Sequence, residues 1–170
     1  MPQALRYTGR QMRILIPLMV LLAACAPAPP TVMGRASVID GDTLEIHDQR
    51  IRLWGVDAPE ARQLCDDAVG AAYACGRLSA NRLDQRLENK TVSCWLQDTD
   101  RYGRMVARCE MDGEDVGAWL VRQGLAVRNA RYAGAAYLIE EVAARRDKAG
   151  IWAGSFTDPE DWRRQRRGGK

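Results

Sequence analysis

Acidic side chains occur at two places that also carry strand-forming residues. The stretch VIDGDTLEI contains Asp42, and the stretch IRLWGVDAPEAR contains Asp57 and Glu60. Carboxylates that are brought together repel one another unless a positive charge intervenes, and Ca²⁺ prefers carboxylate, carbonyl and water oxygens. The pattern therefore suits a calcium site, although a solvated, turn-rich strand end would also contain aspartates.

Two arginines accompany these carboxylates. Arg52 lies in the second stretch, and Arg104 follows DTDRYG at the start of another predicted strand. A guanidinium group binds phosphate oxygens through a bidentate fork and keeps its charge. Carboxylates for a metal, another carboxylate to move a proton and arginines for a phosphate are the components of metal-assisted phosphodiester hydrolysis. The structural alternatives are that Arg52 pairs with Glu45 across a hairpin and that Trp54 belongs to the core.

Alternating residues predict the strands that would position these groups. Residues 35–46 and 50–57 form a predicted hairpin with HDQR as its turn. This register sets Asp42 roughly opposite Gly55 and brings Asp42 and Asp57 to the same end of the hairpin. Glu60 would follow just beyond it.

Further periodicities complete the predicted domain. The stretches KTVSCWL and RMVARCEM form a second predicted hairpin around QDTDRYG. Helical spacing of apolar residues predicts helices over residues 68–88, 113–123 and 134–149. Strands, a helix, a hairpin and two further helices predict an α+β fold with a small barrel.

Four cysteines remain when Cys25 is set aside, and they allow three disulfide pairings. Cys94 and Cys109 are about equally far from the tip of the second hairpin, so they face each other at a separation that suits a disulfide. Cys65 and Cys75 are then left to close the segment after Glu60. Zinc is the alternative, but no spacing is C-x-x-C and His47 is the only histidine.

The N-terminus predicts export. Residues 1–24 place three arginines before the apolar run ILIPLMVLLAA, as in a signal peptide. The sequence LAAC resembles a bacterial lipobox and predicts acylation of Cys25, with ordinary signal cleavage as the alternative. Prolines in residues 25–34 predict an extended tether. We expect an exported protein of the periplasm or cell envelope, attached to the membrane through the lipid on Cys25.

The charge of the chain is unevenly distributed. Lys and Arg number 25 against 22 Asp and Glu, a formal net charge of +3. The signal peptide contains three of the arginines and no acid, and the predicted basic tail, residues 155–170, ends in WRRQRRGGK with five positive charges. The body between them is net acidic, so any anion site must be local. Arg164 and its neighbours either attract nucleic acid non-specifically or form a solvated tail.

Four stretches in order, VIDGDTLEI, IRLWGVDAPEAR, DTDRYGRMVA and WLVRQGLAV, resemble successive motifs of the staphylococcal nuclease (thermonuclease) family. The resemblance runs from about Val38 to Trp152 and assigns residues 35–154 to a nuclease domain. It implies an OB-fold five-stranded β-barrel with about three α-helices. It also implies Ca²⁺-dependent hydrolysis of DNA and RNA by an enzyme that we expect to be monomeric.

The resemblance also assigns roles by position. Asp42 and Asp57 match the calcium carboxylates, and Ala58 takes the place of the residue whose backbone carbonyl completes the protein ligands. Glu60 matches the general base. The remaining matches are the two phosphate-binding arginines, Arg52 and Arg104, and the residues that hold the neighbouring phosphate, Arg101 and Tyr102.

One departure concerns the base. Where the best-known family member stacks a base on tyrosine, this chain has Ala130, followed by Arg131 and by Tyr132, which we expect to contact the substrate. Base–aromatic stacking is worth about 1–3 kcal/mol per base. The departure therefore affects subsite affinity and base preference, but not the expected hydrolysis. A non-catalytic OB module that binds nucleic acid or protein is the rival hypothesis. The presence of Asp42, Glu60 and both phosphate-binding arginines favours the enzyme, and a lipoprotein scaffold would not need that set.

Overall fold

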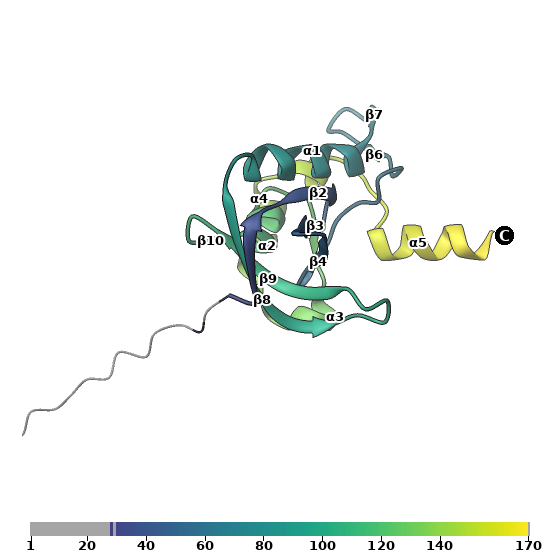
Figure 1. Cartoon of the computed structure of the whole chain (residues 1–170). Coiled ribbons are helices and arrows are strands. Elements are labelled where there is room, and N and C mark those ends of the chain that lie inside the picture. Colours follow the sequence, from purple (N-terminus) through teal and green to yellow (C-terminus); the bar gives the residue numbers. More distant parts are fainter. Residues whose placement is uncertain (1–27, 29, 170) are drawn as a thin grey trace, which may run out of the picture.

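The computed structural model describes residue 28 and residues 30–169 (Figure 1). The predicted signal peptide and the predicted acylation site, Cys25, lie outside the described residues. In the part of the chain that is described, no helix has the length and apolar character needed to cross a membrane.

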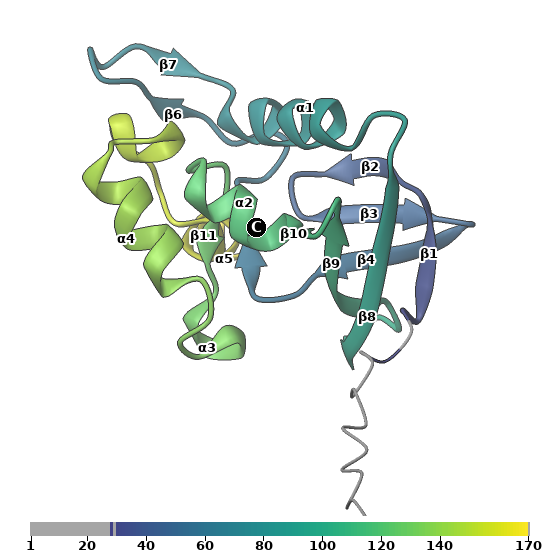
Figure 2. The ribbon, with the colours of Figure 1, turned by 90° about the vertical axis from the view of Figure 1, so that its left-hand side faces the viewer.

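A curled mixed sheet forms the body of the domain (Figure 2). Its strands are β1 (Val32–Arg35), β2 (Ser37–Asp40), β3 (Thr43–Ile46), β4 (Gln49–Leu53), β8 (Thr91–Thr99), β9 (Met105–Met111) and β10 (Glu114–Asp115). The order across the sheet is β1-β8-β9-β4-β3-β2, with β10 on β9, and β4 runs parallel to β9. The two edge strands, β1 and β2, are joined through Ala36 alone, and this short link curls the sheet into a half-barrel. The α+β fold with an OB-type sheet is confirmed.

The core lies inside this curled sheet and under two helices. Strand β9 alternates buried and more exposed residues, as expected for a strand with one face in the core. Helix α1 (Cys75–Leu87) buries Leu83 and Leu87 against the sheet, and α2 (Val116–Arg122) buries Leu120 and Val121 in the same cluster. These helices therefore fix the strands whose ends carry the candidate site.

Shorter elements extend the domain beyond the sheet. They are β5 (Val56–Asp57), β6 (Cys65–Asp66), β7 (Ala72–Tyr73), β11 (Val127–Arg128), α3 (Ala130–Ala133), α4 (Leu138–Arg146), the 3₁₀ helix η1 (Gly150–Ala153) and α5 (Pro159–Gly168). Strand β5 pairs with β11, and β6 pairs with β7. The three predicted helices correspond to α1, α2 and α4, while α3 and α5 are additional.

Both predicted disulfides are present. Cys94 and Cys109 are directly paired across β8 and β9, and their side chains lie in the core. Cys65 and Cys75 close the segment between Glu60 and α1, at a sequence separation of ten. The first pair stabilises the hairpin and the second constrains a loop that leads out of the candidate site.

The predicted first hairpin is wrong in register and extent. Residues 35–46 do not form one strand, because the chain turns at Gly41 and β2 folds back on β3. The β3–β4 turn consists of His47 and Asp48, both with positive φ, so Thr43 faces Arg52. Asp42 therefore lies beside Leu53, whose N–H donates to the Asp42 carbonyl at 2.8 Å, and not opposite Gly55.

Three predicted boundaries also differ. The predicted tether ends earlier, since β1 begins at Val32 and pairs with β8. The first predicted helix starts late, at Cys75, because residues 72–73 form β7 and the disulfide shapes the preceding segment. The predicted tail contains α5, whose first turn is capped by the Asp158 side chain and begins with Pro159.

Candidate active site

Arg52 joins the two buried carboxylates of the site. It extends from β4 and donates from Nη1 to Asp42 Oδ1 at 3.1 Å and from Nη2 to Asp57 Oδ1 at 3.0 Å. Asp42 is only 5% exposed and Asp57 only 2%. The predicted convergence of these three residues is thus present, and the alternative pairing of Arg52 with Glu45 is not, because Glu45 contacts Arg50 instead.

The turn between β2 and β3 sets the direction of Asp42. The Asp40 carboxylate accepts a hydrogen bond from the Asp42 N–H at 3.1 Å, as Asp does in turns. A Cβ on Gly41 would lie 2.6 Å from both the Ala58 Cβ and the Ser79 Oγ, so only glycine allows this close approach. The Ala58 N–H in turn donates to Asp42 Oδ2 at 3.3 Å.

Burial makes the negative charge of the Asp42 carboxylate unfavourable, and the neighbouring arginine does not fully offset this effect. Its pKa is raised to about 7, mainly because burial disfavours the charged form, while Arg52 opposes the shift and Asp40 and Asp57 add to it. Burial alone would lower the pKa of Arg52, but the charges of Asp42 and Asp57 outweigh it and raise that pKa. The pocket therefore favours an additional cation.

Glu60 lies on the loop after β5 and is held there by backbone contacts. Its N–H donates to Gln63 Oε1 at 3.1 Å, and its carbonyl accepts from the Gln63 N–H at 2.7 Å. A Cβ on Gly76, in the first turn of α1, would lie 1.8 Å from the Glu60 carbonyl oxygen. The helix thus packs directly on the Glu60 backbone, while the Glu60 side chain stays 37% exposed and can meet solvent.

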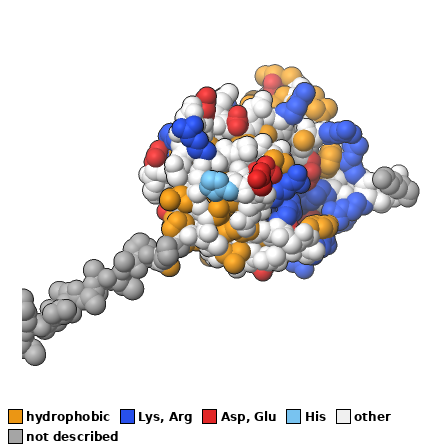
Figure 3. All heavy atoms as spheres, in the orientation of Figure 1, with side chains coloured by type: hydrophobic (Ala, Val, Ile, Leu, Met, Phe, Trp, Pro, Cys, Tyr) orange, Lys and Arg blue, Asp and Glu red, His pale blue; other side chains and the backbone are white. Residues whose placement is uncertain are grey.

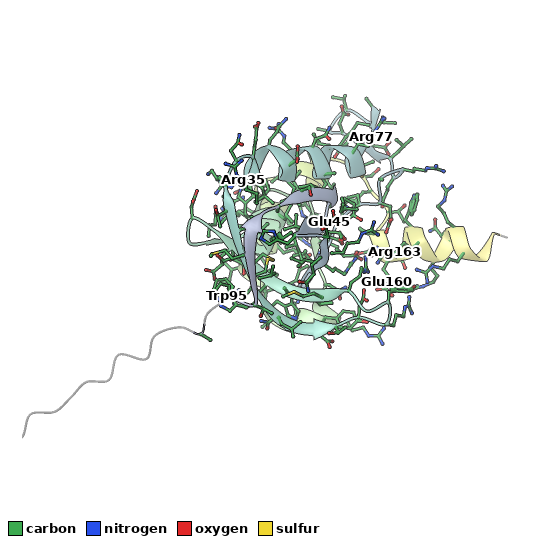
Figure 4. All side chains as sticks on the ribbon, viewed as in Figure 1. Arg35, Glu45, Arg77, Trp95, Glu160 and Arg163 are labelled. Carbon is green, nitrogen blue, oxygen red and sulfur yellow. A yellow bond between two sulfur atoms is a disulfide. The ribbon has the colours of Figure 1, made fainter. Side chains whose placement is uncertain are left out.

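A third arginine enters the site from α5. Figure 4 labels Arg163 on this helix. Arg163 donates from Nη1 to Asp57 Oδ1 and Glu60 Oε1, both at 2.9 Å, and from Nη2 to Asp57 Oδ2 at 2.6 Å. These hydrogen bonds, opposed by burial, raise the Arg163 pKa, so its charge is permanent. Arg163 thus connects a helix near the C-terminus to the two carboxylates that sequence analysis placed at the centre of the chemistry.

Arg104 approaches from the turn between β8 and β9. Its Nε donates to Asp100 Oδ2 at 2.7 Å, and Asp100 Oδ1 accepts the backbone N–H groups of Tyr102 and Arg104. Burial would raise the Asp100 pKa, but these hydrogen bonds outweigh it and lower the pKa. Among the described residues, the terminal nitrogens of Arg104 make no ion pair, so they remain available to an anion.

One cleft, with a volume of about 920 Å³, is lined by Asp42, Arg52, Glu60, Arg104 and Arg163. The predicted substrate residues Arg101, Tyr102 and Tyr132 line it as well, and Tyr102 and Tyr132 are 70% and 64% exposed. Trp54 lines the cleft and also packs against the core, where its ring meets Tyr137 edge-on. Figure 3 shows basic side chains gathered on the side of the molecule near α5.

The donor set suits a hard divalent cation. Asp42 and Asp57 offer carboxylate oxygens, the Ala58 backbone lies against Asp42, and two guanidinium groups already supply positive charge at these oxygens. Within the described part of the chain, no three acidic, histidine or cysteine side chains converge as a larger ligand set. Two carboxylates and a backbone carbonyl would leave the other positions to water and substrate oxygens, as Ca²⁺ permits.

Sequence analysis missed three residues of this site. Arg163 lies in the segment that the sequence predicts to be a basic tail, although the Asp158-Pro159 pair is a helix-start signal. Gln63 is completely buried and joins two loops, a role for which its sequence carries no signal. Asp40 lies in the motif VIDGDTLEI, but its role is the hydrogen bond that it accepts from the Asp42 N–H in the turn after β2.

Comparison with known proteins gives a consistent result. Residues 50–154 match the family model described as staphylococcal nuclease homologue. The chain is 42% identical over 135 residues to the succinoglycan biosynthesis protein ExoI of Rhizobium meliloti (strain 1021), covering 78% of this chain and 71% of that protein. It is 34% identical over 155 residues to an uncharacterized endonuclease of Escherichia coli O157:H7, covering 87% and 94%. It is also 32% identical over 122 residues to the staphylococcal-like nuclease CAN1 of Arabidopsis thaliana, covering 71% and 35%.

The two hydrogen bonds of the buried Gln63 side chain lead to a first prediction. Its Nε2 donates to the Thr157 carbonyl at 2.6 Å, so Gln63 ties the Glu60 loop to the segment before α5. Gln63→Met keeps the size and leaves both partners unpaired, which should lower the free energy of unfolding by about 1–3 kcal/mol. Denaturant unfolding measures this loss, and amide hydrogen exchange should show faster local opening of α5.

Tyr137→Phe is the control for this change. It removes the hydrogen bond from the Tyr137 hydroxyl to Asp115 at 3.1 Å, which lies away from the α5 attachment. It should reduce stability without changing hydrogen exchange in α5. Equal exchange in α5 for the wild type and Gln63→Met would contradict the proposed attachment.

Proposed function

This chain belongs to the staphylococcal nuclease family and is a nuclease, and we propose that it hydrolyses phosphodiester bonds in DNA and RNA with Ca²⁺ as its metal. The observation that carries the proposal is that Asp42, Glu60, Arg52 and Arg104 line one cleft. The buried Asp57 joins them through hydrogen bonds with Arg52 and Arg163. The family is generally Ca²⁺-dependent. An all-oxygen donor set with one under-compensated buried carboxylate supports the same metal here.

Asp42, Asp57 and the Ala58 carbonyl would hold the ion. When bound, Ca²⁺ supplies positive charge to a phosphate oxygen and so favours attack at phosphorus. The rigid position of Asp42, which is fixed by the turn at Gly41 and by the Ala58 N–H, keeps that carboxylate in place without reorganisation.

Glu60 is the proposed general base. Its Oε1 contacts Arg163, whereas its Oε2 accepts no hydrogen bond from the described residues. The side chain is more than one-third exposed, so a water molecule can reach that oxygen and give up a proton to it. The backbone contacts with Gln63 and Gly76 hold the base beside the cleft.

Arg52 and Arg104 are the proposed phosphate-binding residues. Arg52 has five N–H donors and uses three contacts for the carboxylates, which leaves donors for a phosphate oxygen. Arg104 is oriented through its Nε by Asp100 and presents its terminal nitrogens to the cleft. Charge that develops on the phosphate in the transition state would meet two fixed guanidinium groups. Arg101, Tyr102 and Tyr132 would contact the neighbouring nucleotides.

The metal is tested by its removal. The full-length protein should degrade single-stranded DNA and RNA with Ca²⁺ and stop when a chelator is added. Mg²⁺ should support a lower rate, because it demands near-octahedral geometry and loses its water reluctantly. Release of acid-soluble nucleotides measures the rate. Undiminished hydrolysis in chelator would contradict the metal assignment.

The roles of the side chains are tested by single-turnover rates. Glu60→Gln keeps the shape and removes the base, so the rate should fall by about 10²–10⁴-fold. Arg104→Ala removes a charge-stabilising donor and should cost about 10²–10³-fold, with a smaller change in substrate affinity. Arg122→Ala is the control, since Arg122 forms an exposed pair with Asp147 outside the cleft. Wild-type rates for Glu60→Gln and Arg104→Ala would refute the assigned site.

We further propose that the enzyme is exported and acylated on Cys25. The support is the sequence LAAC after an apolar run with basic residues before it. Cys25→Ser should move the protein from the detergent-soluble membrane fraction to a soluble or unprocessed form. Immunoblotting of cell fractions measures the change, and a wild-type protein that is already soluble would rule out the lipid anchor while leaving export open.

A further inference from the structure

Helix α5 lines the same cleft as the proposed catalytic residues. The residues it contributes are Glu160, Arg163, Arg164 and Arg167. Their spacing of three, four and seven residues places them on one face of the helix. Arg101 and Arg104, on the β8–β9 turn, line another part of the cleft. Besides Arg52 on β4, the carboxylates therefore have arginines from two further elements around them.

The start of α5 is firmly attached to the body. Pro159 is buried, and the Thr157 carbonyl accepts from the buried Gln63 side chain. The Ser155 hydroxyl donates to Asp66 at 2.6 Å, next to Cys65, whose disulfide closes that loop. From this attachment, α5 extends outward from the domain (Figure 1). Its position beside the cleft is therefore built into the fold.

The arginines on α5 differ in the side chains that they contact. Arg164 pairs with Glu160 and Asp161 of its own helix and remains 70% exposed, and such surface pairs contribute little. Arg167 makes no ion pair with any described residue. Arg166, in contrast, lies over the Trp162 ring and does not line the cleft. The cleft-facing side of α5 thus presents guanidinium groups that can change partners at small cost.

The Arg163 guanidinium and a bound divalent cation would compete for the same carboxylate, Asp57. Among the described residues, the three carboxylates of Asp42, Asp57 and Glu60 form ion pairs only with Arg52 and Arg163. A divalent cation at Asp42 and Asp57, together with the two arginines, would more than balance the three carboxylates. Arg163 would then repel the ion where it now contacts Asp57, and its most favourable new partner would be an anion.

We propose that α5 is a nucleic-acid-binding arm, in which Arg163, Arg164 and Arg167 bind backbone phosphates of the strand that lies in the cleft. Arg163 exchanges Asp57 and Glu60 for a phosphate when metal and strand are bound. Arg163 and Arg167 are about 6 Å apart along the helix axis, close enough for nearby phosphates of one strand. Guanidinium groups suit this role because they form bidentate contacts with phosphate. The inference rests on the proposed function, since it assumes that a nucleic-acid strand occupies the cleft.

The arm is tested by comparing two variants of the same helix. Arg167→Ala and Arg166→Ala each remove one positive charge from α5, but only Arg167 lines the cleft. The probe is a fluorescent single-stranded oligonucleotide of about twelve nucleotides. Its Kd is measured by anisotropy in chelator, where the proposed enzyme does not cleave, over a range of salt concentrations.

Arg167→Ala should lower the slope of log Kd against log salt by about 0.7, the value for one phosphate contact on a single strand. This corresponds to about fivefold weaker binding at 0.1 M salt relative to a 1 M reference. Arg166→Ala should keep the wild-type slope. Equal losses in both variants, or a wild-type slope in Arg167→Ala, would overturn the arm.

The exchange of partners by Arg163 has its own readout. Arg163→Ala removes a cation that competes at Asp57 and Glu60, so calorimetry without nucleic acid should show Ca²⁺ binding that is several-fold tighter than in the wild type. Arg163→Lys keeps a charge and should give an intermediate Kd. An unchanged or weaker Ca²⁺ affinity in Arg163→Ala would overturn the exchange.

Failure of the arm is distinguishable from failure of the proposed function. A wild-type protein that binds Ca²⁺ and cleaves the oligonucleotide, together with an Arg167→Ala variant of unchanged salt dependence, overturns the arm alone. A wild-type protein that neither binds Ca²⁺ nor cleaves overturns the proposed function, and the inference about α5 falls with it.

Discussion

The burial of two carboxylates beside each other is the constraint on which this site depends. Asp42 and Asp57 are almost completely buried, and a buried charge is tolerated only when it is paired and hydrogen-bonded. Arg52 and Arg163 supply that compensation, yet the Asp42 pKa still lies near 7 because burial dominates. A buried pair of this kind contributes little to stability by itself. The two carboxylates instead form a negatively charged pocket that can bind a divalent cation.

The backbone around this pocket is fixed by close contacts that tolerate few substitutions. Gly41 allows the β2–β3 turn to approach Ala58, and Gly76 allows α1 to touch the Glu60 carbonyl. Gln63 then connects the Glu60 loop to the residues before α5. The proposed general base is therefore on a loop, but that loop is held by a helix, a buried amide and a disulfide. Such support lets a loop residue keep a defined position while its carboxylate remains accessible to water.

The parts of this site that the sequence predicts are those that depend on local pattern. Cys94 and Cys109 face each other because a hairpin is symmetric about its tip, and Arg52 reaches Asp42 because neighbouring strands bring them close. The register was off by two residues because His47 and Asp48 adopt positive φ without a glycine to indicate it. Arg163 could not be placed, since its contact with Asp57 spans 106 positions and depends on the path of the chain around the disulfide loop.

The contacts of Arg163 also couple the affinity for the metal to the affinity for the nucleic-acid strand. The same guanidinium cannot fully serve Asp57 and Glu60 while it binds a phosphate, and the metal competes for the same carboxylates. If the metal frees Arg163 for nucleic acid and so raises the affinity for the strand, the strand must raise the affinity for the metal by the same factor. Metal binding without substrate would then be weakened by the internal cation. The complete site would form most favourably when a strand is present, with Glu60 released from Arg163 at the moment when its basic oxygens are needed.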